Sequence, residues 1–467
     1  MSKIKKKKTH LEKLRTIRNL ESAWQTIQEN GRSSKSDKVR LELEDFAIDA
    51  QKRLRSLQNK LARKTFKFPP AAGVPIPKDK PPKDGGRQKI RPIVLAPVES
   101  RIVQRALLNV LLDIEGLKPY SKTEFSFGGI RSDRPQSPAS RTERSKSISA
   151  VPAAIQAVLT AIDQGGRHVA CADISSFFTR IRKSTVTAII GDVVKDQEFM
   201  DFLGQAIDVE LSNIEQIKQY ADDFPTEDLG VAQGNSLSPL LGNIILADFD
   251  KKMNEGDCRC IRYIDDFIII APTQKAADAR LKKSIELLKA LEMELSKAKS
   301  SKGGQSIDDG FDFLGIHISP GIIRPSDKSK ERFLEKIENT FREGKQALIG
   351  RKNGQAVSRT GSLLGTLKRI DGTVDGWAKH YWFCNDGLTL GHLDQKVSEY
   401  VRDYLGAYKT VREAVNAEHH GELLGVSQLK KIPRTPFKYP SVSLVPKKKA
   451  AVPPKQSMNQ NLFRERK

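Results

Sequence analysis

Three acidic side chains, in two segments far apart in the sequence, have the type and setting to bind divalent metal ions. Asp265 and Asp266 follow Tyr263 and precede the apolar run 267–270, which predicts a β-hairpin with both acids at its tip. Asp173 ends another apolar stretch, 169–172. Carboxylate oxygens suit Mg²⁺, and two metal ions about 3.5–4 Å apart can activate a hydroxyl group and stabilise a leaving pyrophosphate. The acids therefore predict a site for two Mg²⁺ ions, with Mn²⁺ as the alternative.

Each of these acids also has a simpler explanation. Adjacent aspartates occur on ordinary solvated turns, and Asp173 could instead cap a helix that begins within 174–178. Asp173 and Asp265 lie 92 positions apart, so only a shared β-sheet brings them together. The metal site therefore requires that the strand ending at Asp173 is a neighbour of the hairpin.

A glycine-rich segment, 230–239, lies between the two acidic segments and leads into the apolar run 240–247. Small residues let the backbone approach a flat ligand such as a base pair, and Gln233, Ser236 and Ser238 offer hydrogen bonds. The same residues also fit an ordinary helix start, with Ser238 as the N-cap and Pro239 at the first helical position. Both interpretations can hold together.

The order and spacing of these segments resemble the reverse transcriptases of the group II intron and bacterial retroelement type, which include retron-like and phage-defence enzymes. The resemblance covers roughly residues 70–320. The matching segments are Ile76–Lys78, 91–97 with 99–106, Phe125–Gly129, Asp173–Phe178, 233–239, Tyr263–Asp266 and Phe313–Ile316. A weaker similarity to the thumb, or maturase, helices continues at 375–382, where the aromatic residues could equally form a core.

The resemblance implies an α+β fold of the right-hand polymerase type, with fingers, an antiparallel-sheet palm and a helical thumb. A basic N-terminal arm and helical extension precede these parts, and a basic, proline-containing tail follows them. The expected boundaries are 1–70 for the extension, 71–168 for the fingers, 169–320 for the palm, 321–410 for the thumb and 411–467 for the tail. Within the palm we expect a helix over 228–250 and the catalytic hairpin over 258–271.

The resemblance also implies roles for individual residues. Asp173 and Asp265 would bind the metals, and Asp266 would support them or the primer end. Lys78 and Arg91 would hold the triphosphate, because a guanidinium group suits bidentate phosphate contact and an ammonium acts as a point charge. Each of these two cations could instead be an ordinary surface residue.

Three further residues take roles from the resemblance. Phe178 falls where the family places the aromatic residue that excludes a ribose 2′-hydroxyl, although a core phenylalanine is the alternative. Gln233 would line the site behind the templating base pair, and Lys299 stands where the family has its palm lysine. The sequence departs from the intron family at Ala232, where proline is usual, and in the insertion 132–149.

Hydrophobic periodicity predicts the elements around the site. One helix is expected over 36–62 with Ser36 as its cap, and helical stripes are expected at 281–295 and 333–341. Helices would cover one face of a single antiparallel palm sheet. Its expected strands are Val169–Ala172, Arg259–Tyr263, Phe267–Ala271 and Phe311–Ile318.

Composition agrees with a nucleic-acid partner. The chain has 80 Lys and Arg against 57 Asp and Glu, a net charge of +23, which suits a phosphate-rich ligand. Positive charge gathers in 3–8 and in 430–467, where eleven Lys or Arg stand with one acid. These ends are expected to be nucleic-acid-binding arms, with a merely solvated tail as the alternative.

Other sequence features limit the location and the chemistry. No apolar run of eighteen residues and no secretory signal is present, which predicts a cytoplasmic protein without a membrane partner. The four cysteines, Cys171, Cys258, Cys260 and Cys384, form no zinc-binding pattern. The 57 residues after position 410 are too few for an RNase H domain.

The preferred hypothesis is therefore an RNA-directed DNA polymerase that extends a 3′-hydroxyl with deoxynucleotides on an RNA template, as a stand-alone bacterial enzyme. A DNA primer and product are expected partners, and the priming group is left open. Its template would be a dedicated non-coding RNA, and antiviral defence is one expected role. The alternatives are a minimal intron-encoded maturase, template-independent or protein-primed DNA synthesis, and an inactive RNA-binding scaffold. The oligomeric state is left open.

Overall fold

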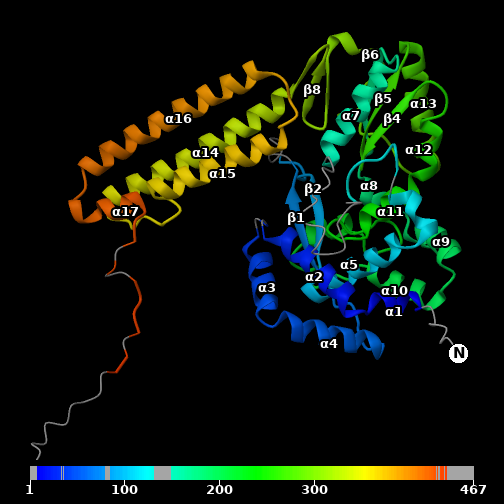
Figure 1. Ribbon diagram of the computed structural model, residues 1–467, viewed down its shortest axis with the longest axis horizontal. Helices are drawn as coiled ribbons and strands as arrows, with labels where there is room; N and C mark the ends of the chain where they lie inside the picture. Colours follow the sequence, from blue (N-terminus) through cyan, green and yellow to red (C-terminus); the bar gives the residue numbers. More distant parts are fainter. Residues whose placement is uncertain are drawn as a thin grey trace, which may run out of the picture. The chain divides into compact units, whose positions relative to one another are not determined.

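A computed structural model describes residues 8–32, 34, 36–78, 85–121, 123–130, 149–427, 429, 432–435 and 437–438. The basic residues before Lys8, the expected insertion up to position 148 and most of the expected C-terminal arm lie outside these residues. The chain divides into two compact units, Met1–Lys336 with Val374–Ser398 and Ile337–Thr373 with Glu399–Lys467 (Figure 1). Among the described residues, no helix has both the length and the apolar character to cross a membrane.

Helices form the N-terminal part of the first unit. They are α1 (His10–Leu14), α2 (Ile17–Gly31), α3 (Asp37–Ile48), α4 (Ala50–Ala62) and α5 (Val98–Leu112). The Ser36 hydroxyl caps α3 by accepting from the Val39 N–H at 3.4 Å, as predicted. The single helix expected over 36–62 is wrong, because Asp49 (φ −124°, ψ 31°) interrupts it. This break lets Phe46 and Leu54, one from each helix, enter the same hydrophobic core.

A two-stranded antiparallel sheet, β1 (Ala72–Pro77) with β2 (Ile90–Leu95), forms the hairpin expected for the fingers. An isolated parallel bridge joins Ile93 of β2 to Gln233, which extends this sheet with the glycine-rich segment. The Val94 N–H donates to the Gln233 carbonyl at 2.9 Å. The expected fingers hairpin is therefore attached directly to the loop that precedes the apolar helix.

The central sheet has the strand order β4-β5-β3-β6 and is antiparallel throughout. Its strands are β3 (His168–Asp173), β4 (Arg259–Tyr263), β5 (Asp266–Ala271) and β6 (Gln305–Ser306). The α+β class and the first three predicted palm strands are confirmed.

Helices cover both faces of this sheet, so the expectation of one covered face is wrong (Figure 1). Successive side chains of a strand point to opposite faces. Phe267 and Ile269 of β5 accordingly join the core that contains α13 (Gln274–Ala290), while Ile268 and Ile270 join the core that contains α7 (Ala150–Asp163). Burial on both faces explains why β5 is a continuous apolar run rather than an alternating one.

The remaining helices of the first unit lie around this sheet. They are α6 (Lys118–Ser121), α8 (Phe177–Arg180), α9 (Lys183–Val194), α10 (Gln197–Ile207), α11 (Ser238–Ile245) and α12 (Ala247–Met253). The helix expected over 228–250 begins only at Ser238, whose hydroxyl donates to the Ala232 carbonyl at 2.7 Å instead of capping. The expected stripe 281–295 is also too long, because α13 ends at Ala290 and Leu295 pairs with Ile174.

A separate three-stranded antiparallel sheet contains β7 (Phe311–Phe313), β8 (Ile316–Ser319) and β9 (Ile322–Pro325). The single palm strand expected over 311–318 is therefore wrong. Leu314 and Gly315 have φ of 52° and 78°, so the chain reverses there and forms a hairpin outside the central sheet. Trp377 and Tyr381 pack beside this sheet in the core shared with α7.

Three long helices run through both units: α14 (Asp327–Lys352), α15 (Leu363–His380) and α16 (Gly387–Glu413). The helix predicted from the stripe 333–341 is confirmed by α14. In the second unit, Phe341 packs against the fully buried Tyr404 with ring centroids 5.2 Å apart. The short helix α17 (His420–Leu424) contacts the loop between α14 and α15, because the Glu422 side chain accepts a hydrogen bond from the Val357 N–H at 2.8 Å.

Candidate active site

Strand pairing brings the three predicted acids together. Asp173 is the last residue of β3, and its register partner is Asp266, the first residue of β5. Asp265 occupies the turn between β4 and β5, and its carbonyl accepts from the Ile174 N–H at 2.9 Å. Asp173 therefore ends a strand and does not cap a helix; α8 starts at Phe177 with Ser176 as its N-cap.

The turn that carries Asp265 is strained. Ile264, the first of its two residues, has φ +61°, while Asp265 is not among the residues with positive φ. Glycine is the usual residue at such a position, and a β-branched side chain there is a genuine outlier. Strain of this kind costs of order 1–3 kcal/mol and persists only where surrounding contacts impose it. The site therefore depends on contacts that hold the turn.

A basic side chain faces the acids from the other edge of β3. The Lys299 ammonium lies 2.8 Å from the Asp173 carboxylate, which is buried, while Lys299 itself is exposed. Backbone contacts fix this segment: the Ser296 N–H donates to the Asp173 carbonyl at 2.8 Å, and the Asp173 N–H donates to the Ser300 hydroxyl at 3.2 Å. Lys299 is thus placed at the site by the main chain around it.

Burial and mutual repulsion make the Asp265 and Asp266 carboxyl groups hard to ionise. Burial raises the pKa of Asp266 to about 7, and a hydrogen bond to Asp173 and the charge of Asp265 add to the rise. Burial also raises the pKa of Asp265, with the charge of Asp173 adding and those of Lys299 and Arg91 opposing. The hydrogen bond to Asp173 raises the pKa of Lys299. Positive charge brought to this site would stabilise the ionised acids.

The residue types fit hard divalent cations, although the Asp173 side chain is bonded to Lys299 and Asp266. In the part of the chain that the structure describes, no group of three or more His, Cys, Asp or Glu side chains has closed into metal-binding geometry. Asp173 instead bonds to Lys299 and Asp266. Carboxylates, such as the three at the adjoining ends of β3 and β5, are nevertheless the oxygen ligands that Mg²⁺ and Mn²⁺ take. Asp173, Asp265 and Asp266 are the residues that would hold such ions.

Of the predicted triphosphate-binding residues, Arg91 lies near the acids and Lys78 lies directly after β1. Arg91 is an exposed residue of β2, close enough that its charge lowers the pKa of Asp265. Lys78 is exposed just after β1, and its N–H donates to the Lys89 carbonyl at 2.9 Å. Both cations therefore belong to the hairpin of β1 and β2, and of the two it is Arg91 whose charge acts on the acids.

Phe178 and Gln233 lie on segments that contact each other. Phe178 is half-buried beside Phe177, with ring centroids 5.2 Å apart, and its carbonyl accepts from the Val231 N–H at 2.8 Å. Gln233 is also half-buried and is held by the bridge to β2. Gly234 follows with φ +116°, and a Cβ there would lie 2.8 Å from the Val94 carbonyl oxygen. Only glycine lets the loop approach β2 this closely.

Sequence reasoning missed Arg262, a fully buried residue of β4. Its guanidinium forms two bonds to the Asp250 carboxylate, at 2.7 and 2.5 Å, and donates to the Ile264 carbonyl at 2.9 Å. The sequence feature that could have indicated it is an arginine within a mostly apolar strand, two residues before the turn that carries Asp265. That signal is weak, since arginine is rarely buried.

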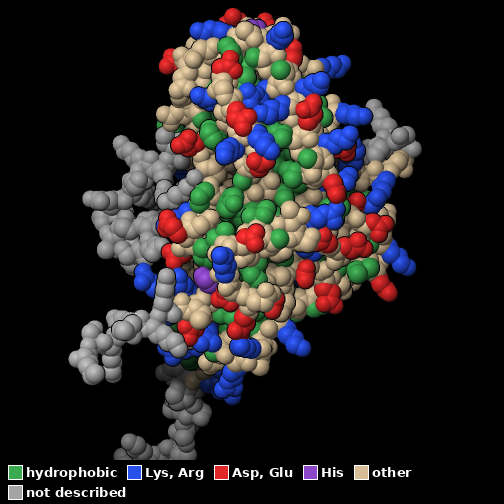
Figure 2. Space-filling view, turned by 90° about the vertical axis from the view of Figure 1, so that its right-hand side faces the viewer, with side chains coloured by type: hydrophobic (Ala, Val, Ile, Leu, Met, Phe, Trp, Pro, Cys, Tyr) green, Lys and Arg blue, Asp and Glu red, His purple; other side chains and the backbone are tan. Residues whose placement is uncertain are grey.

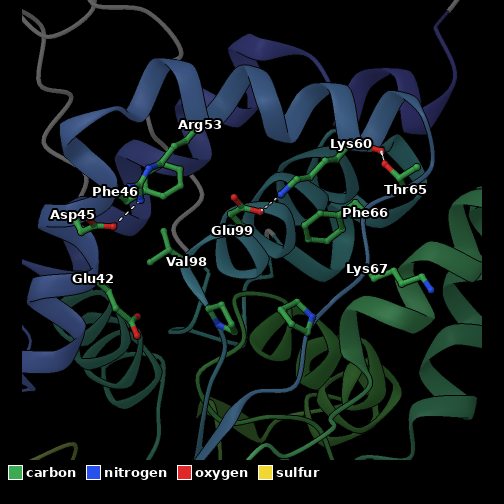
Figure 3. Close-up of a pocket in the computed structure, with 12 residues that line it drawn as sticks. Glu42, Asp45, Phe46, Arg53, Lys60, Thr65, Phe66, Lys67, Val98 and Glu99 are labelled. Atoms are coloured by element: carbon green, nitrogen blue, oxygen red, sulfur yellow. Dashed lines mark hydrogen bonds and ion pairs between the residues drawn. The ribbon is translucent and has the colours of Figure 1, made fainter.

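A hollow of about 580 Å³ lies away from the acids, beside α3, α4 and the start of α5 (Figure 3). Two of its cations are paired: Arg53 lies 2.8 Å from Asp45, and Lys60 lies 2.9 Å from Glu99. Its lining contains none of the eight residues predicted for the site. This hollow is therefore not the candidate active site.

The surface charge is mixed on one face of the molecule. Figure 2 shows Lys and Arg interspersed with Asp and Glu around a central patch of hydrophobic side chains. The net charge of +23 is thus not gathered on this face.

Comparison with known proteins agrees with the geometry. The family described as reverse transcriptase (RNA-dependent DNA polymerase) matches residues 76–318, more than half of the chain. The chain belongs to this reverse transcriptase family. The resemblance inferred from the sequence is confirmed, and the matched region contains all eight residues proposed for the site.

Individual relatives are distant. YkfC of Escherichia coli (strain K12) is 26% identical over 278 residues, which are 51% of this chain and 65% of YkfC, so the chain spans less than two thirds of that relative. Among solved structures, a partial Cas6-RT-Cas1–Cas2 complex matches 61% of this chain and 42% of its own, at 19% identity and a TM-score of 0.32. Apo telomerase from Candida tropicalis, truncated from its C-terminal domain, matches 56% of this chain and 55% of its own, at 14% identity and a TM-score of 0.35.

The raised pKa of Asp266 predicts a pH-dependent stability. The pKa of this carboxyl group is about 7 in the folded state and near 3.8 in the unfolded state. Its contribution to stability is therefore complete below pH 3.8 and is lost as the pH rises through about 7. In EDTA, the free energy of unfolding should therefore fall between pH 5 and pH 8, and by less in Asp266→Asn. Urea unfolding at both pH values measures this. The exposed Asp309→Asn is the matched control and should behave as wild type; equal slopes in all three proteins would contradict the assignment.

The close approach at Gly234 predicts a second result. Gly234→Ala should destabilise the protein by roughly 1–3 kcal/mol, because it adds both strain at positive φ and a contact with the Val94 carbonyl. Gly204→Ala, in α10 with no atom within 4 Å of the added methyl group, should be neutral or stabilising by about 0.4–1 kcal/mol. Thermal and urea unfolding compare the two, and equal effects would refute the argument.

Proposed function

We propose that this protein is an RNA-directed DNA polymerase, which extends a 3′-hydroxyl with deoxynucleoside triphosphates on an RNA template. The observation that carries the proposal is the register pairing of Asp173 with Asp266, which puts two acids from distant segments beside Asp265. Membership of the reverse transcriptase family supports the reaction class. Phosphoryl transfer needs mainly positioning and neutralisation of negative charge.

The side chains divide this work by position. Asp173 and Asp265 would hold two Mg²⁺ ions, or Mn²⁺ in their place, with Asp266 supporting them or the primer end. Bound metal ions would activate the 3′-hydroxyl and stabilise the leaving pyrophosphate. Without metal ions, Asp266 is mostly ionised only above its raised pKa of about 7, and the ionised form is the one that would bind a cation. The three acids thus form the anionic half of the site.

The cations would neutralise the incoming nucleotide. Arg91, whose charge acts on Asp265, would bind the triphosphate together with Lys78, which follows β1 of the same hairpin. Lys299 is exposed beside Asp173 and can exchange that partner for a phosphate oxygen. Each contact of this kind is stronger than a neutral hydrogen bond because both groups are charged.

Substrate selection would depend on Phe178 of α8 and on Gln233 of the glycine-rich loop. Phe178 would exclude a ribose 2′-hydroxyl by its bulk. Gln233 would line the site behind the templating base pair, on the loop that Gly234 brings against β2. These two residues therefore would act on the sugar and the base, and the acids on the phosphates.

The net positive charge of the chain bears on its partners. The excess of 23 positive charges favours long phosphate-bearing partners. We infer an RNA template and a DNA primer, with a dedicated non-coding RNA as the template of a stand-alone cytoplasmic bacterial enzyme. Antiviral defence is the role that we favour for it.

Primer extension tests the proposed activity. The full chain should incorporate dTTP on poly(rA)/oligo(dT) with Mg²⁺, and Asp265→Asn should lower the rate by about a thousandfold or more, because a metal ligand is lost. Asp309→Asn, an exposed acid outside the site, is the matched control and should retain activity. RNA binding without incorporation would favour a scaffold, and products unrelated to the added template would favour untemplated synthesis; either result overturns the proposal.

The RNA that copurifies with the full chain tests the dedicated template. Sequencing should find one dominant non-coding species, because a dedicated partner outcompetes the more abundant cellular RNAs through specific contacts. Asp265→Asn, which keeps the protein's basic surface, should copurify with the same RNA. A mixture in proportion to cellular abundance would contradict a dedicated template.

A further inference from the structure

The buried Arg262 makes contacts that stability alone does not explain. Alternation along β4 places it on the same face as Cys260, beside α11 and α12, where Phe267 and Ile269 of β5 also lie. Burying a charged side chain is unfavourable unless it is paired. Asp250 of α12, itself 5% exposed, supplies the pair. An apolar pair of similar volume would often be equally stable or more so.

Its remaining hydrogen bonds point to the turn and to neighbouring segments. Nη1 donates to the Ile264 carbonyl at 2.9 Å, and Nη2 reaches the Asn243 side-chain oxygen at 3.3 Å. The main chain of Arg262 is also fixed, since its N–H donates to the Phe125 carbonyl and its carbonyl accepts from the Phe127 N–H, both at 2.8 Å. Hydrogen bonds thus hold both the main chain of Arg262 and its guanidinium group.

The bond to Ile264 fixes one of the two peptide groups that flank Asp265. The Ile264 carbonyl belongs to the peptide group before Asp265, and Arg262 holds it. The Asp265 carbonyl belongs to the peptide group after it, and the Ile174 N–H holds that one at 2.9 Å. With both peptide planes fixed, the direction of the Cα–Cβ bond of Asp265 is fixed as well. The residue with the strained φ of +61°, Ile264, lies immediately before the peptide group that Arg262 holds.

We propose that Arg262, anchored by Asp250, is a positioning residue that aims the Asp265 carboxylate at the metal ions. The inference rests on the proposed function for its effect on catalysis, but its effect on metal binding stands separately. Arg262 touches neither substrate nor metal; it acts through the Ile264 peptide group. Preorganisation of this kind matters because small displacements of a catalytic group lower the rate steeply.

A paired apolar replacement separates positioning from folding. Asp250→Leu with Arg262→Met removes the buried charges together, so cooperative unfolding should survive near the wild-type melting temperature. The bond to Ile264 is lost, so the Mg²⁺ concentration for half-maximal primer extension should rise and kcat should fall by about tenfold or more, with the KM for dTTP little changed. Wild-type metal dependence in this folded variant would overturn the proposal. If the pair fails to fold, Arg262→Lys, which keeps the charge beside Asp250 but loses the forked geometry, is measured in its place.

Relieving the strain in the turn should partly compensate for the loss of Arg262. Ile264→Gly removes the penalty for positive φ, so the turn needs less support from Arg262. The loss caused by the Asp250→Leu, Arg262→Met pair should therefore be at least several-fold smaller in the Ile264→Gly background, which a double-mutant cycle measures. Identical losses in both backgrounds would mean that Arg262 does not act through the turn.

Arg280 is the matched control, since its guanidinium also binds backbone carbonyls, those of Lys252, Met253 and Glu255 at the end of α12. Arg280→Met should lower the melting temperature without changing the Mg²⁺ dependence.

Metal binding gives a readout that does not need polymerase activity. Mg²⁺ or Mn²⁺ should raise the melting temperature of wild type and of Arg280→Met, and by much less in the Asp250→Leu, Arg262→Met pair. If wild type shows this shift but does not polymerise, the proposed function fails while the positioning role stands. If the pair keeps the full shift, the positioning role fails, whatever the activity.

Discussion

The antiparallel pairing of β3 with β5 is the constraint on which the site depends. Because side chains alternate between faces, a shift of one residue in this pairing would turn Asp173 to the wrong side of the sheet. The apolar residues of β5 cannot prevent that shift by themselves, since both faces of the strand are buried. Ala170 and Ala172 contribute instead, because they are the small residues of β3 on the face that α13 covers. The Ile174 N–H bond to Asp265 then fixes the register at the open end.

Gathering the acids at this point works against folding. Desolvation and mutual repulsion raise the pKa values of Asp265 and Asp266, so at neutral pH the folded chain holds carboxyl groups that resist ionisation. Lys299 opposes this from the neighbouring segment, but it is exposed and can offset only part of it. Perturbed titration of this kind is typical of functional sites. The apolar residues of the two flanking cores supply the stability that this arrangement requires.

Local pattern was sufficient to predict the hairpin, the strand ending at Asp173 and the α+β class, because each follows from short-range periodicity. It was not sufficient for features that depend on tertiary packing. The segment Phe311–Ile318 is rich in β-forming residues throughout, and only the positive φ at Leu314 and Gly315 reveals its reversal. Asp49 lies inside a continuous helical stripe and breaks it. Arg262 was missed because a charged residue in a strand suggests exposure, while here Asp250, from another helix, makes its burial tolerable.

The hairpin of β1 and β2 is joined to the glycine-rich loop by a main-chain contact, and its Arg91 side chain acts on the acids. Arg91 and Val94 belong to the same strand, β2, and Val94 is bonded to the carbonyl of Gln233. That bond requires the close approach that Gly234 permits. The charge of Arg91 therefore reaches Asp265 from a strand whose position the loop determines. Arg91, which we propose binds the incoming triphosphate, thus belongs to the strand that is bonded to the loop carrying Gln233. A displacement of that loop would therefore also displace the strand that carries the cation.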